Sequence, residues 1–107
     1  MTNKEMDALI AERVMGWHRG PSFKGRSEWW YNGEEFEISV REWHPMTDEA
    51  QALRALEVMC DKGYEARLGK SGREWWAWLS KYDEGSTFFD PLFSVAVCLA
   101  LAEAVKE

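Results

Sequence analysis

The sequence predicts an α+β fold with the element order α-β-β-α-β-β-α and a four-stranded, mainly antiparallel sheet on which the helices pack. Three observations support this prediction. Apolar residues recur at helical spacing in three segments, they recur along two pairs of shorter strand-like segments, and a glycine-containing turn joins each pair. The 107 residues suffice for one hydrophobic core, so we expect a single domain over residues 1–107.

Two amphipathic helices are expected in the first two thirds of the chain. The first spans Asn3–Met15 and begins with Thr2 and Glu5 at the spacing of a capping box. The second begins at Thr47, which two acidic residues follow, and ends at Gly63. Its expected buried stripe consists of Ala52, Leu53, Leu56, Met59 and Cys60.

The last predicted helix is apolar on nearly every side. Asp90 and Pro91 suit its cap and first position, and apolar residues then dominate Leu92–Ala102. A helix of this kind is either deeply buried or lies in a contact between subunits. The apolar run is shorter than the roughly 20 residues that cross a membrane.

Two hairpins are expected between these helices. The first pairs Ser27–Tyr31 with Glu34–Trp43 around Asn32-Gly33, which suits a type I′ turn. The second pairs Tyr64–Leu68 with Arg73–Tyr82 around the sequence GKSG. The last of these strands has large apolar residues on both faces, and such strands are usually covered on both sides.

Composition and charge exclude several functional classes. The chain is 46% apolar and 30% charged, as in ordinary globular proteins, and its net charge is −6. Binding to long nucleic acid or to an anionic membrane requires a basic surface, so we expect neither partner. Residues Met1–Met15 lack the continuous apolar core of a signal peptide, and two cysteines cannot form the disulfide framework of a small secreted domain. We therefore expect a soluble intracellular protein.

Motifs for metal binding and catalysis are weak. His18, His44, Cys60 and Cys98 do not share the short spacing of zinc ligands, so we expect no metal and no cofactor. The sequence contains no nucleophile elbow and no phosphate-binding loop. Carboxylates do cluster in the second strand and near residue 84, and they leave open a metal-dependent nuclease or phosphodiesterase as a minor alternative.

The segment Trp17–Tyr31 is the strongest candidate for a functional site. Its first part, Trp17–Ser27, has the composition of a loop, and the whole segment carries three cations against one acid. Arginine and lysine bind phosphate, and aromatic rings stack on bases, so the segment favours a small anionic ligand such as a nucleotide. The alternative is that the tryptophans fill the core and the cations only keep the loop soluble. The candidate ligand-binding residues are Trp17, Arg19, Lys24, Arg26, Trp29, Trp30 and Tyr31.

Three stretches of sequence, taken in order, resemble a small family of phage and prophage proteins. They read MDALIAERVMGW, HPMTDEAQALRALEVM and DPLFSVAVCLALAEAV. The family pattern commonly has Ser where this chain has Met46. The resemblance implies an α/β/α ("ABA") sandwich and a phage protein of the bacterial cytoplasm. It implies no established activity, and it transfers no catalytic residues.

Three functions remain open from the sequence. By analogy with accessory proteins of phages that block host defence, the leading hypothesis is a non-catalytic protein that sequesters a nucleotide messenger of host immunity. Its apolar last helix would support a homo-oligomer. The main alternative is a protein-interaction module that docks on a host protein, with exposed aromatic residues as anchors. An enzyme is the minor alternative.

Overall fold

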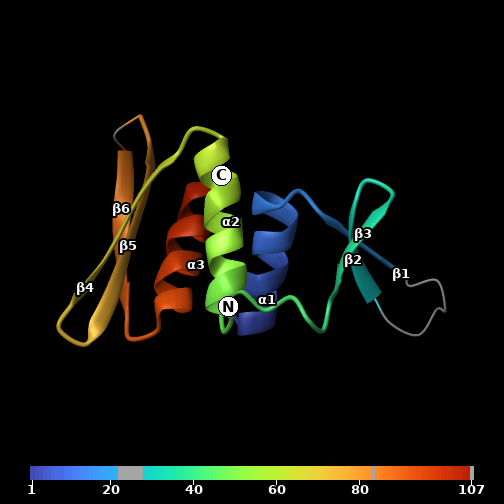
Figure 1. Ribbon diagram of the computed structural model, residues 1–107, viewed down its shortest axis with the longest axis horizontal. Helices are drawn as coiled ribbons and strands as arrows, with labels where there is room; N and C mark the ends of the chain where they lie inside the picture. The colour runs from blue at the N-terminus through green and yellow to red at the C-terminus, as the bar shows by residue number, and fades with distance from the viewer. Residues whose placement is uncertain (22–27, 83, 107) are drawn as a thin grey trace.

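The computed structural model describes residues 1–21, 28–82 and 84–106, and within them it has a helical layer with a small sheet on either side (Figure 1). Its helical elements are α1 (Asn3–Leu9), η1 (Ile10–Val14), α2 (Glu49–Asp61) and α3 (Phe93–Ala104). The strands are β1 (His18–Pro21), β2 (Glu28–Asn32), β3 (Glu35–Ser39), β4 (Glu65–Ser71), β5 (Glu74–Lys81) and β6 (Glu84–Asp90).

The first helix forms where the sequence predicts it. The Thr2 hydroxyl accepts the backbone N–H of Glu5 at 3.1 Å, and the Glu5 carboxylate accepts the N–H of Thr2 at 3.3 Å, which completes the capping box. The helix does not continue regularly to Met15, because η1 is a π-helical segment and the N–H of Met15 bonds to the carbonyl of Ile10 at 3.1 Å.

The other two helices begin at later residues than predicted, and Leu53 and Cys60, which were expected in the buried stripe of α2, are exposed. The N-cap of α2 is Asp48 in place of Thr47, and its carboxylate accepts the N–H of Gln51 at 3.1 Å. The N-cap of α3 is Leu92, while the Asp90 carboxylate accepts the N–H of Leu92 at 2.9 Å just before the helix. Each helix therefore still begins beside an acidic side chain.

The prediction of one four-stranded sheet is wrong. Two antiparallel sheets of three strands form instead, in the orders β1-β2-β3 and β4-β5-β6. The sequence patterns do not predict β1, which lies in the expected loop Trp17–Ser27, or β6. Both strands exist because a neighbouring strand supplies a complete set of pairing partners, and such tertiary context overrides weak local propensity.

The first hairpin turns at the predicted place but with a different geometry. Asn32 pairs with Glu35, so the loop consists of Gly33 and Glu34, and of these only Gly33 has a positive φ, +65°. A type I′ turn needs positive φ at both central residues, whereas glycine at the first position is typical of a type II′ turn. The next strand also ends early: the N–H groups of Glu42 and Trp43 both donate to the carbonyl of Ser39, which turns the chain away from the sheet.

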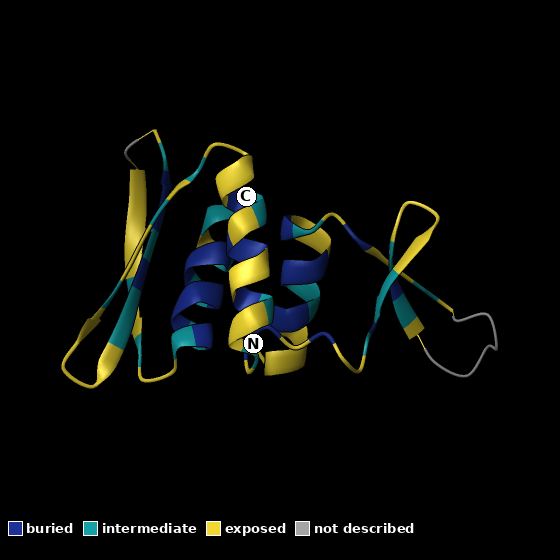
Figure 2. Cartoon of the chain, viewed as in Figure 1, coloured by how far each residue is buried: buried dark blue, intermediate teal, exposed yellow. Residues whose placement is uncertain are grey.

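The helices pack on one face of the sheet β4-β5-β6, with α3 directly against β5 and β6 and α2 beside α3. Buried residues concentrate in this helical layer (Figure 2). Within the described residues no second layer covers the outer face of β5, contrary to the prediction. Its Trp76 and Trp78 are half-buried because their indoles lie over Gly69 and Gly85 of the neighbouring strands.

Candidate functional site

The sheet β1-β2-β3 contains the described part of the predicted ligand-binding segment, and strand pairing divides it between two faces. Arg19 pairs with Trp30, whereas His18 pairs with Tyr31 and Gly20 with Trp29. Side chains alternate between faces along a strand. Arg19 and Trp30 therefore share one face, and Trp29 and Tyr31 lie on the opposite face. Phe23, Lys24 and Arg26 lie outside the described residues.

Two of the predicted aromatic residues belong to the core. Trp17 is 4% exposed and packs edge-on against Trp43, with ring centroids 4.8 Å apart. Trp30 is 1% exposed. Trp43 is held in turn by its indole N–H, which donates to the carbonyl of Asp7 at 3.0 Å. Neither the Trp17 nor the Trp30 ring presents an open face, so these two residues do not meet the expectation of rings that stack on a ligand.

The inner face of β1-β2-β3 closes a cavity against α1, which we call the cationic groove. Its volume is about 260 Å³. The residues that line it are Lys4, Asp7, Ala8, Arg19, Glu28, Trp30, Val40, Arg41 and Trp43. Three cationic side chains therefore face two carboxylates in a chain whose net charge is −6.

Arg19 is the best-positioned cation of this groove. Its guanidinium carbon lies 5.0 Å from the centroid of the Trp30 ring, and its Nε lies 3.6 Å from a carboxylate oxygen of Glu28. Stacking on a buried indole restricts the orientation of the guanidinium. Both partners of the ion pair are substantially exposed, so the pair contributes little and an incoming anion can replace Glu28. Within the described chain, Lys4 and Arg41 form no ion pair.

Asp7 forms the buried end of the groove. Its carboxylate accepts the backbone N–H of Met46 at 3.0 Å, which joins α1 to the segment before α2. Burial raises the pKa of Asp7, and the hydrogen bond from Met46 opposes that shift. Because Asp7 is only 8% exposed and its carboxylate accepts the N–H of Met46, we assign Asp7 a structural role.

The outer face of β1-β2-β3 carries a continuous group of rings, which we call the outer aromatic face. The His18 and Tyr31 rings are stacked at 5.5 Å, Tyr31 lies 4.9 Å from Phe36, and Phe36 lies 5.4 Å from Trp29. Nε2 of His18 donates to the carbonyl of Gly33 at 2.8 Å, and the Tyr31 hydroxyl donates to the carbonyl of Pro21. These bonds hold both rings against the sheet.

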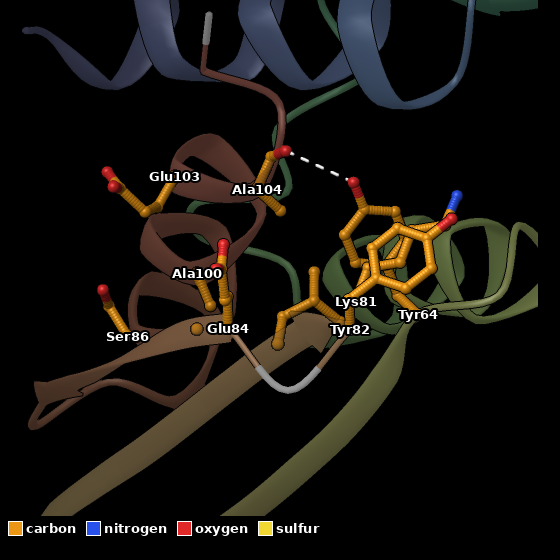
Figure 3. Close-up of a pocket in the computed structure, with 10 residues that line it drawn as sticks. Tyr64, Lys81, Tyr82, Glu84, Ser86, Ala100, Glu103 and Ala104 are labelled. Atoms are coloured by element: carbon orange, nitrogen blue, oxygen red, sulfur yellow. Dashed lines mark hydrogen bonds between the residues drawn. The ribbon is translucent and has the colours of Figure 1, made fainter.

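A larger cavity of about 440 Å³ lies at the other end of the molecule, between α3 and the β5–β6 turn (Figure 3). Among the residues that line it are Tyr64, Lys81, Tyr82, Glu84, Glu103 and Ala104. The Lys81 ammonium lies 5.4 Å from the Tyr64 ring, whose hydroxyl donates to Ala104 at 3.5 Å. One cation against two carboxylates suits an anionic ligand less well than the cationic groove does.

Both cysteines have a raised pKa, and the described acidic residues form no metal-binding cluster. No group of three or more His, Cys, Asp or Glu side chains within the described ranges could hold a metal ion. Burial raises the pKa of Cys98 to about 12, which keeps its thiol protonated. Cys60 is exposed, but desolvation and the nearby acids Asp61 and Glu57 raise its pKa as well.

Sequence reasoning missed Lys4 and Arg41 as members of the groove. Lys4 lies in the first turn of α1 and Arg41 in the turn after β3, far from the predicted segment. Both were ordinary surface cations in the sequence. Only the packing of α1 beside the sheet brings them together with Arg19, and no sequence signal indicated that packing.

Comparisons with known proteins agree with the geometry of the fold. Residues 8–101 match the model of a protein family described as the Phage ABA sandwich domain. The 2.0 Å crystal structure of a phage protein from Bacillus cereus ATCC 14579 is similar, with a TM-score of 0.69 and 14% sequence identity over 98% of this chain and 93% of that chain. At that identity the likeness shows the fold alone. No curated protein matches, and across the described residues no helix is both long and apolar enough to span a membrane.

Proposed function

The chain belongs to the phage ABA sandwich domain family, and from this premise we propose that it is a small, non-catalytic phage protein that binds a phosphorylated ligand in the cationic groove. The proposal rests on one observation: the side chains of Lys4, Arg19 and Arg41 line the same cavity. Charge-assisted hydrogen bonds from arginine to phosphate are among the strongest that proteins make.

The dimensions of the groove indicate which part of a ligand it holds. Its volume of about 260 Å³ is below the roughly 300 Å³ at which sites for drug-sized molecules begin. The groove therefore accommodates a phosphoryl group with its adjoining sugar, and a base would extend outside it. Trp30 supports this binding indirectly, because its ring positions the Arg19 guanidinium. Of the residues expected at the site, Arg19 and Trp30 keep a role in this proposal.

We place this binding activity in the bacterial cytoplasm, where the protein would sequester a nucleotide messenger of host antiviral defence. Family membership supports a phage origin, and the excess of cations in the groove supports an anionic ligand. Sequestration requires that the ligand is held and released unchanged. This property separates a binder from a nuclease or phosphodiesterase.

Isothermal titration calorimetry tests the proposal with inorganic phosphate, linear nucleotides and cyclic dinucleotides at low ionic strength. Removing one charged hydrogen-bond partner costs about 1.5–3 kcal/mol, so Arg41→Gln and Arg19→Gln should each weaken binding by roughly 10- to 150-fold. The matched control is Arg67→Gln, because Arg67 is exposed on the other sheet and pairs with Glu65. Folded wild-type protein that gives no heat with any of these ligands contradicts the proposal. Mass spectrometry of ligand recovered after denaturation should show no chemical change.

The outer aromatic face favours a second candidate function, docking on a host protein. Phe36 is 42% exposed, and Trp29 and Tyr31 beside it are half-buried. Aromatic residues are enriched at the anchoring positions of interfaces. On this hypothesis Phe36→Asp would abolish retention of a defined host protein without changing the heat of nucleotide binding, whereas Arg41→Gln would have the opposite pattern.

A further inference from the structure

An apolar groove runs along α3 between η1 and β6, on a part of the molecule that neither proposed function uses. Its volume is about 500 Å³, and it is open on its outer side. Leu9 and Phe88 form its walls, and Leu99, Ala102 and Val105 line it from α3 and its end. Met1, Arg13, Glu103 and Lys106 also line it, so the groove has two basic side chains and one acidic side chain at its rim.

The exposed side of α3 continues this groove as a stripe of apolar residues. Leu92, Val95, Leu99 and Ala102 follow one another at spacings of three and four residues, so they share one side of the helix. Leu92 is 58% exposed, and the other three are half-buried. In contrast, the residues on the remaining sides of α3 are buried against the sheet and α2, among them Ala96, Val97, Ala100 and Leu101.

The chain also exposes more surface than a compact monomer of its size. Its accessible surface is 6904 Å², whereas a 12.5 kDa monomer is expected to expose about 6200 Å². Its radius of gyration is 14.2 Å, compared with about 13 Å for a compact domain of this length. The sheet β1-β2-β3 contributes part of the excess by projecting from the helical layer.

We propose that the occupant of this groove is a second copy of the same chain, related by a two-fold axis that passes near Leu99. In a two-fold interface each patch meets its own copy, so α3 packs antiparallel to the partner's α3. The protruding Leu92 of each copy then enters the open groove of the other beside the partner's Val105. The same arrangement brings Asp90 close to the partner's Lys106, which gives opposite charges at both ends of the interface.

A second copy supplies charge that complements the rim of the groove. The rim carries two basic side chains, Arg13 and Lys106, against one acidic side chain, Glu103, and the acidic Asp90 lies at the other end of α3. A strongly basic partner would place like charges against Arg13 and Lys106, which reduces affinity. Two antiparallel copies pair opposite signs at both ends and also oppose their helix dipoles.

Sedimentation velocity over a wide range of concentrations tests this inference on the full chain. The wild-type protein should shift from 12.5 kDa to twice that mass as its concentration rises. Leu92→Glu should abolish the shift, because it places a charge in the interface without touching the core. The matched control is Leu53→Glu, which changes an exposed leucine on α2 and should leave the shift intact. A wild-type protein that stays monomeric, or a dimer that survives Leu92→Glu, overturns the inference, as does an equal loss in both variants.

Cross-linking checks the orientation of the two copies. Leu99→Cys, made together with Cys60→Ser to remove the exposed native thiol, should form an intermolecular disulfide under mild oxidation, because residue 99 lies beside its own copy at the axis. Leu53→Cys in the same background should not. A dimer in which Leu99→Cys fails to cross-link, or in which Leu53→Cys cross-links equally well, contradicts the antiparallel arrangement.

Discussion

Alternation of side chains along β2 predicts that two adjacent tryptophans contribute very differently to stability. Trp30 faces inward and is 1% exposed, whereas Trp29 lies on the outer aromatic face and is half-buried. Replacing each by alanine therefore compares the same chemical change on opposite faces of one strand.

The magnitude follows from buried area. A tryptophan buries up to about 250 Å², and at roughly 25 cal/mol per Å² this corresponds to an upper bound of about 6 kcal/mol for Trp30. Measured truncations of buried aromatic residues cost about 3–5 kcal/mol, which is the loss we expect for Trp30→Ala. Trp29 keeps contact with water and has one edge contact to Phe36, so Trp29→Ala should cost only about 1 kcal/mol.

Urea unfolding followed by circular dichroism measures both losses, because the far-ultraviolet signal depends only weakly on the number of tryptophans. In thermal unfolding of the same variants, each kcal/mol lost from the free energy of unfolding lowers the melting temperature of a chain of this length by about 4 °C. Trp30→Ala should therefore lower the melting temperature by roughly 12–20 °C and Trp29→Ala by roughly 4 °C. Equal losses for the two variants, or a loss below about 1 kcal/mol for Trp30→Ala, would refute the assignment of the two faces.

Three further predictions concern other parts of the molecule. Burial raises the pKa of Asp7, so the folded protein binds this proton more tightly than the unfolded chain does. The stability that this proton provides is fully present below the ordinary pKa of aspartate and is lost as the pH rises through the raised value. Asp7→Asn still accepts the N–H of Met46, so its unfolding free energy should improve relative to wild type as the pH rises, and parallel curves for the two proteins would contradict this. Because Cys60 is exposed and the pKa of Cys98 is about 12, a thiol reagent should label one cysteine in the native protein and two in urea. Fast labelling of both native thiols would show that α3 is less tightly packed than described. Gly85→Ala would place a methyl group 2.7 Å from the carbonyl oxygen of Leu79, so it should cost about 1–3 kcal/mol in a melting experiment. An unchanged melting temperature would show that β6 adjusts freely.

The candidate site could be predicted from the sequence only in part. Of the residues predicted in Trp17–Tyr31, Arg19 lines a cavity and Trp30 supports its guanidinium, whereas the Trp17 ring packs in the core against Trp43. Only Trp17–Ser27 was expected to be a loop, and within it His18–Pro21 forms the strand β1, which Trp17 directly precedes. Trp29 and Trp30, in the segment predicted as a strand, lie on opposite faces because side chains alternate along a strand.

The second hairpin turns at Gly72 and Arg73 and not across the predicted GKSG, because β4 continues to Ser71. Local patterns by themselves determined the three helices, the acidic first turns of α1 and α2, and the position of the first hairpin turn. These features depend on contacts within a few residues, such as the capping box of Thr2 and Glu5, so the order of residues is sufficient to specify them. Membership of the phage ABA sandwich domain family was likewise visible in the order of three short stretches.

Only the tertiary structure decided the number of sheets, the strands β1 and β6, and the composition of the cationic groove. The groove depends on residues distant in sequence, and β1 and β6 depend on pairing with the neighbouring strands β2 and β5. β1 is a strand because β2 supplies its hydrogen bonds, and Lys4 meets Arg41 because α1 packs beside β1-β2-β3. Such contacts form only when burial of the shared core offsets the entropy of closing long loops. A short segment of sequence does not determine whether burial exceeds this entropy cost.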